Sequence, residues 1–101
     1  MADASSSGAF SADGARWRFA GTLTFDDATR VLASARALPL PESGVVDLAG
    51  LTHADSSALA VLLAVRRRAA AEGGRSLVFT GMPATLDALA RVYGIESLLA
   101  A

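Results

Sequence analysis

The chain has no cysteine and no lysine, and its only histidine is His53. The absence of cysteine excludes disulfide bonds, thiolate catalysis and cysteine metal sites. One histidine cannot form a multi-histidine metal site by itself. We therefore expect a protein without a metal, without a cofactor and without catalytic activity. All nine basic residues are arginines, which together with the abundant alanine is typical of GC-rich bacterial genomes.

The chain also lacks a strong charge of either sign and a long apolar run. Its formal net charge of −1 gives no reason to expect a surface for nucleic acid or for acidic membranes. The longest apolar stretch, residues 58–65, is too short to cross a bilayer. Residues 1–8 have neither the basic region nor the apolar run of a signal peptide. We expect a cytoplasmic protein with no direct membrane insertion.

About half of the residues are apolar, and 101 residues suffice for one compact domain with its own core. Residues 1–7 are small and polar, which indicates a flexible N-terminal tail. We therefore expect a single domain over residues 8–101, without internal repeats or linkers.

The hydrophobic patterns predict strands that alternate with helices. Strands are expected over residues 7–11, 15–21, 44–48 and 76–80, and helices over residues 24–38, 56–72 and 83–93. Thr24 and Asp27 form a potential capping box at the start of the first helix. The order predicts an α/β sandwich with a mixed sheet of about four strands and three or four helices. The aromatic residues expected in its core are Trp17, Phe19, Phe79 and Tyr93.

Residues 45–63 predict a buried strand, a short polar loop and a long helix, with Asp55, Ser56 and Ser57 where the loop becomes the helix. Aspartate and serine are preferred helix caps, so this segment can simply be a well-capped helix. The alternative is that it is a switch. A phosphate on Ser56 would be held by the free first-turn amides. It would add about −1.5 to −2 charges beside Asp55 and Asp47, and so label the surface for a partner.

The long helix has two unlike sides. Its apolar side carries Ala58, Val61, Leu62, Val65 and Ala69, and its opposite side carries Ala60, Ala64, Arg67, Arg68 and Ala71. Small residues allow another helix to approach closely, and arginines can pair with carboxylates at a rim. Alanine is also the best helix former, so an ordinary exposed helix explains the pattern as well. Residues 66–68 are three consecutive arginines that point in three directions, which does not favour nucleic-acid binding.

The arrangement resembles the STAS domain family over residues 9–99. The resemblance rests on residues 47–48, residues 55–59, the glycine pair at 73–74 and residues 21–24. Residues 86–95 are similar to the last helix of the MlaB-like members. These members are small STAS subunits of the Mla phospholipid-transport ABC complex of Gram-negative bacteria.

The resemblance implies a non-catalytic subunit that binds an MlaF-like ATPase, supports its assembly and activity, and lies at the inner membrane through this partner. The partner surface expected from the helix and the segment before it comprises His53, Asp55, Ser56, Ser57, Ala60, Ala64 and Arg67. Ser56 falls on the position that is a phosphorylated serine in anti-sigma factor antagonists. The alternative function is therefore such an antagonist, which binds an anti-sigma factor and is regulated by a serine kinase. A hydrolase that uses Ser56 or His53 is a third hypothesis.

Overall fold

The computed structural model describes residues 8–95, in which four strands form one mixed sheet. The strands are β1 (Ala9–Asp13), β2 (Arg16–Leu23), β3 (Val45–Ala54) and β4 (Val78–Thr80), and they lie in this order across the sheet. β1 pairs antiparallel with β2, whereas the two remaining pairs are parallel. The mixed four-stranded sheet confirms the predicted fold class.

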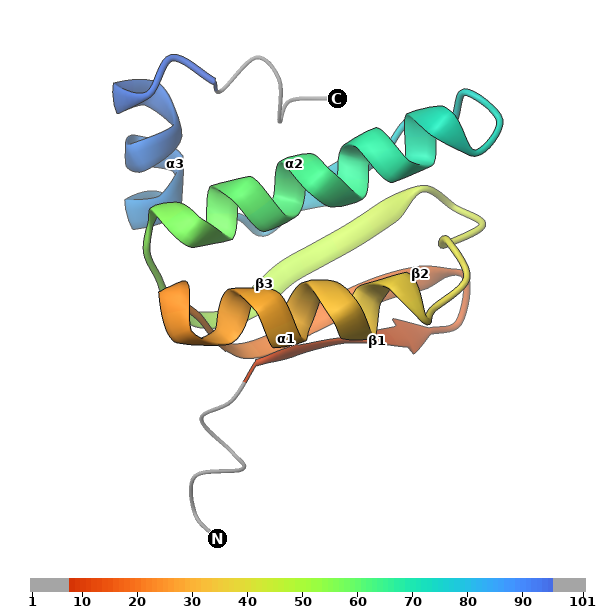
Figure 1. The fold of residues 1–101 in the computed structure, drawn as a ribbon, viewed down its shortest axis with the longest axis horizontal. Coiled ribbons are helices and arrows are strands. Elements are labelled where there is room, and N and C mark those ends of the chain that lie inside the picture. Colours follow the sequence, from red (N-terminus) through yellow and green to blue (C-terminus); the bar gives the residue numbers. More distant parts are fainter. Residues whose placement is uncertain (1–7, 96–101) are drawn as a thin grey trace, which may run out of the picture.

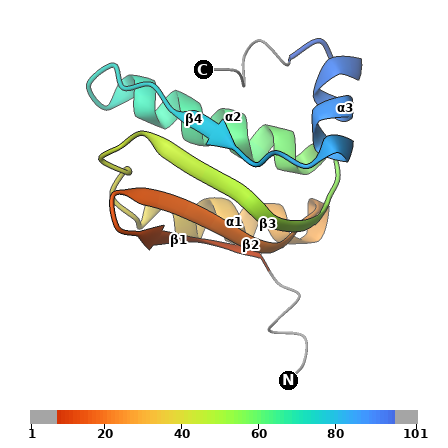
Figure 2. The same cartoon turned by 180° about the vertical axis from the view of Figure 1, so that it is seen from behind.

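Three helices are present between residues 8 and 95: α1 (Phe25–Arg36), α2 (Ser56–Ala71) and α3 (Ala84–Val92). α1 and α2 lie side by side on one face of the sheet and run in the same direction, and α3 lies beyond the first turn of α2 (Figure 1). Seen from behind, the strands are in front of both long helices and no helix covers them (Figure 2). The order of the elements agrees with the prediction. Within the described residues, no helix has both the length and the hydrophobicity that a membrane crossing requires.

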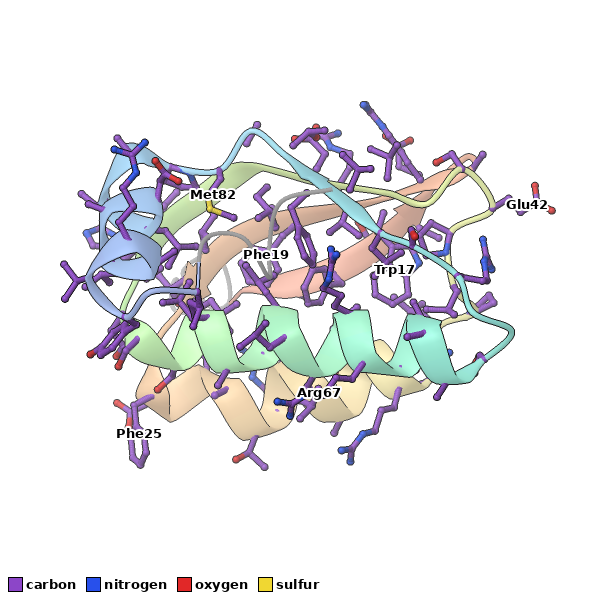
Figure 3. All side chains as sticks on the ribbon, turned by 90° about the horizontal axis from the view of Figure 1, so that it is seen from above. Trp17, Phe19, Phe25, Glu42, Arg67 and Met82 are labelled. Carbon is purple, nitrogen blue, oxygen red and sulfur yellow. The ribbon has the colours of Figure 1, made fainter. Side chains whose placement is uncertain are left out.

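The core lies between the sheet and the two long helices. Trp17 and Phe19 are almost fully buried there (Figure 3), as predicted. The indole N–H of Trp17 donates to the carbonyl oxygen of Pro39 at 3.0 Å. Phe79 is partly buried against this core. The prediction was wrong for Tyr93, which is 56% exposed. Tyr93 comes directly after α3, and the last buried residue of that helix is Ala90.

β3 is longer than predicted, and the expected polar loop over residues 49–54 is wrong. The second half of β2 provides the additional pairing, with Gly21 opposite Leu51 and Leu23 opposite Ala54. Gly50 lies against this strand so closely that a Cβ atom there would be 2.5 Å from the carbonyl oxygen of Phe19. The strand therefore continues almost to α2, and only Asp55 separates the two elements.

The ends of the helices follow the local sequence. The predicted capping box at α1 is present: the Thr24 N–H donates to Asp27 Oδ2 at 3.1 Å, and the hydroxyl groups of Thr22 and Thr24 donate to the same oxygen. These hydrogen bonds, that of the Thr24 backbone above all, hold the pKa of Asp27 below its usual value. α2 ends before Gly73, whose φ of 97° lies in the left-handed region. The predicted tail over residues 1–7, and residues 96–101, lie outside the described part of the chain.

Candidate partner-binding surface

Asp55 joins the first turns of the two long helices. It is the N-cap of α2, and its Oδ1 accepts the Ser57 N–H at 2.9 Å. Its other carboxylate oxygen, Oδ2, accepts the N–H of Phe25, the first residue of α1, at 3.0 Å. One side chain therefore satisfies an otherwise unpaired amide on each helix and holds the two N-termini together.

Ser56 is exposed as the first residue of α2, but its surroundings differ from the expectation. The amides of Ser57 and Ala58 are already occupied, by the carboxylate and by the carbonyl oxygen of Asp55 respectively. A phosphate on Ser56 would therefore compete with Asp55 for these donors. Asp47 lies in β3, eight residues before Asp55 and so about 25 Å from it at the rise of an extended strand. Asp47 forms an ion pair with Arg16 at 3.8 Å. The expected contribution of Asp47 to charge beside Ser56 is therefore wrong.

His53 lies near the end of β3, where it is exposed and in register with Thr22. No hydrogen bond joins its side chain to Ser56 among the described residues, so the pairing that a hydrolase would need is not formed. Residues 8–95 also contain no cluster of three or more side chains suited to hold a metal ion. Within the described part of the chain, Ser56 and His53 therefore form no hydrogen-bonded dyad.

The three consecutive arginines point in three directions, as predicted. Arg66 donates to the carbonyl oxygen of Leu77 at 3.2 Å. The Arg68 guanidinium donates to the carbonyl oxygens of Ala35 at 2.8 Å and Leu38 at 2.7 Å, where α1 ends. Arg68 therefore ties α2 to the last turn of α1. Of the three, only Arg67 is exposed, whereas Arg66 and Arg68 are partly buried (Figure 3).

Two depressions follow the boundary between α1 and α2 and share Leu32. The first, of about 440 Å³, lies at the N-terminal ends, and the second, of about 310 Å³, lies nearer the C-terminal ends. We call them together the α1–α2 groove. It collects four of the residues expected at the partner surface: Ser57 and Ala60 line the first depression, and Ala64 and Arg67 line the second.

The other side of α2 carries a third depression, of about 330 Å³, which Ser56, Leu59 and Tyr93 line. Ala60 borders both this depression and the groove. The expected surface is thus divided between two flanks of α2. His53 and Asp55 lie at its N-terminal end.

The residues of α1 that line the groove were missed from the sequence, most clearly Phe25 and Arg36. Phe25 is 78% exposed. The sequence contained one sign of this: Phe25 is a large apolar residue that directly follows the capping residue Thr24 and lies outside the apolar stripe of the helix.

The fold defines a class of small α/β modules in which two long helices cover one face of a mixed four-stranded sheet. A comparison with models of protein families identifies the family of the chain. A model described as "Mlab, STAS domain" matches residues 7–100, so the chain belongs to the MlaB-like STAS family. No curated protein matches the chain. Family membership supports a regulatory or assembly role, and STAS domains are generally non-catalytic.

Proposed function

We propose that this protein is a non-catalytic subunit that binds the ATPase of an Mla-type ABC phospholipid transporter and supports its assembly and activity. Its membership of the MlaB-like STAS family supports the regulatory or assembly role. In this proposal the protein lies in the cytoplasm and reaches the inner membrane only through the ATPase.

The observation that carries the proposal is the exposure of the outer side of α2. Ala60 and Arg67 are exposed and Ala64 is half-buried, so within residues 8–95 the chain leaves this side open to a partner. Methyl side chains allow close approach of a second surface, and the guanidinium of Arg67 can form paired hydrogen bonds with a carboxylate at its edge.

The test is co-purification of the chain with the ATPase encoded beside it, using Ala60→Glu and Ala64→Glu. Each substitution places a charge in the proposed interface, where an unpaired buried charge is strongly unfavourable. Ala20→Glu is the matched control. Ala20 is exposed and follows the buried Phe19 in β2, so it lies on the opposite face of the sheet. No helix covers that face (Figure 2). We expect the complex to survive in the control and to be lost in both α2 variants. Retention of the complex in all three variants would reject this surface.

An anti-sigma factor antagonist, regulated by a serine kinase, is the alternative function. The exposure of Ser56 at the start of α2 favours it, because a kinase can reach that hydroxyl group. Intact-mass measurement after incubation with the candidate anti-sigma kinase and ATP separates the two functions. Addition of one phosphate that is abolished by Ser56→Ala supports the antagonist, whereas an unchanged mass leaves it without support.

A further inference from the structure

The α1–α2 groove has the shape of a seat for a third helix. α1 and α2 run side by side in the same direction (Figure 1). α1 has 12 residues, so the groove is about 18 Å long, which corresponds to about three turns. The side chains between the two helices are small or aliphatic: Ala28, Leu32, Ala60, Val61, Ala64 and Val65. Such a lining lets another helix approach closely and bury an apolar stripe.

The two ends of the groove differ in charge. Arg36 and Arg67 line its C-terminal end, and among the described residues neither has an ion pair or a hydrogen bond to its guanidinium. Asp26 lies at the N-terminal end and is likewise unpaired within residues 8–95. The exposed ring of Phe25 lies at the same end and points away from the sheet (Figure 3). An occupant that complements the groove therefore carries negative charge at one end and an apolar stripe along its length.

We propose that the α1–α2 groove binds an amphipathic helix of a partner protein, with the acidic first turn of that helix on Arg36 and Arg67. The inference rests on the proposed function only in that this face binds a partner, and it does not require the partner to be an ATPase. Acidic residues are favoured in the first turn of a helix. A helix with its first turn at Arg36 and Arg67 runs antiparallel to α1 and α2, so its dipole opposes theirs favourably.

A helix fits the groove better than the acyl chain of a lipid. Both depressions are open to solvent along the surface, so an acyl chain lying in them would leave much of its apolar area in water. An amphipathic helix covers the apolar lining and presents its polar side outward. The groove is thus suited to a partner helix that has one apolar side and one polar side.

The test is a titration of the full-length 15N-labelled chain with a synthetic peptide, followed by NMR. The peptide has about 14 residues, with two glutamates in its first turn and leucines at i, i+3, i+4 and i+7 spacing. We expect shifts at Ala28, Ser57, Ala60 and Ala64. Arg67→Glu should weaken binding by about tenfold, as loss of a rim ion pair and addition of a like charge do. A second peptide with lysines in place of both glutamates should recover the affinity of this variant.

Ala20→Glu is again the control and should bind the first peptide with unchanged affinity. The proposal would be overturned if the peptide does not bind or if the shifts lie on another face. It would also be overturned if Arg67→Glu does not weaken binding, or if the lysine peptide does not restore the affinity of this variant. The proposal is also overturned if monomeric dodecyl phosphate shifts the NMR signals of the groove residues and the peptide does not. The groove would then bind a small amphiphile and not a helix. If the unsubstituted chain binds the peptide but forms no complex with the ATPase, only the proposed ATPase partner is rejected. Failure of peptide binding while Ala60→Glu and Ala64→Glu still disrupt the ATPase complex rejects only the helix in the groove.

Discussion

Replacing Asp55 should separate its two capping roles. Its carboxylate caps α2 through the Ser57 N–H and α1 through the Phe25 N–H. Asparagine caps a helix as well as aspartate does, but it has only one oxygen acceptor in the amide. Asp55→Asn should therefore retain the bond to Ser57 and lose the bond to Phe25. Asp55→Ala should lose both.

The expected magnitudes follow from these two contacts. Loss of an N-cap costs about 1 kcal/mol, and loss of one further hydrogen bond at a solvent-accessible site costs about another 1 kcal/mol. We expect the free energy of unfolding to fall by about 1 kcal/mol in Asp55→Asn and by about 2 kcal/mol in Asp55→Ala. For a domain of this size, the corresponding decreases in Tm are about 4–8 °C and about 8–16 °C.

Urea unfolding followed by far-ultraviolet circular dichroism measures these differences, and amide hydrogen exchange locates them. In Asp55→Asn the Phe25 amide should exchange faster while the Ser57 amide stays protected. Ser56→Ala serves as the control, because Ser56 is exposed and its hydroxyl group has no hydrogen bond within residues 8–95. Equal destabilisation by asparagine and alanine, or an unchanged Phe25 amide in Asp55→Asn, would refute the double cap.

Two further variants test contacts elsewhere. Arg68→Met should lower the free energy of unfolding by about 2–3 kcal/mol in urea titrations, since it removes two charged hydrogen bonds to the end of α1. Arg67→Met, a matched exposed control, should cost less than about 0.5 kcal/mol, and equal effects would contradict the assigned roles. Because the pKa of Asp27 is lower folded than unfolded, its contribution to stability is present above about pH 4 and is lost as the pH falls through the folded value. Urea titrations between about pH 2.5 and 7 should therefore show a shallower acid loss in Asp27→Asn than in the wild type, and identical slopes would contradict the lowered pKa.

The order of the elements was predictable because most of them carry strong local signals. Trp17 and Phe19 alternate with exposed residues in β2, and the Thr24–Asp27 capping box opens α1. The end of β3 was not predictable, because its alternation of buried and exposed residues breaks around Gly50. The pairing with β2 shifts its register in this region, and the sequence of β3 alone contains no sign of that pairing.

The candidate surface was predictable on α2 and not on α1. Consecutive residues of a helix diverge by a fixed angle, so the sequence alone showed that the three arginines point apart. It could not show that Arg68 reaches the carbonyl oxygens of Ala35 and Leu38, because that contact depends on how α1 packs beside α2. Phe25 and Arg36 were missed for the same reason, since a groove between two helices belongs to neither sequence segment separately.

The ties between the helices explain why this groove can serve as a rigid binding site. α2 contacts α1 through Asp55 at one end of the groove and through Arg68 at the other, while small side chains lie between. The two ties hold the spacing of the helices before a partner arrives, so binding does not require the groove to be ordered first. In the proposed complex, Asp55 and Arg68 therefore act by fixing the spacing of α1 and α2. Their loss should weaken binding of the peptide even though Arg36 and Arg67 remain in place, whereas a groove that forms only around its occupant would show no such dependence.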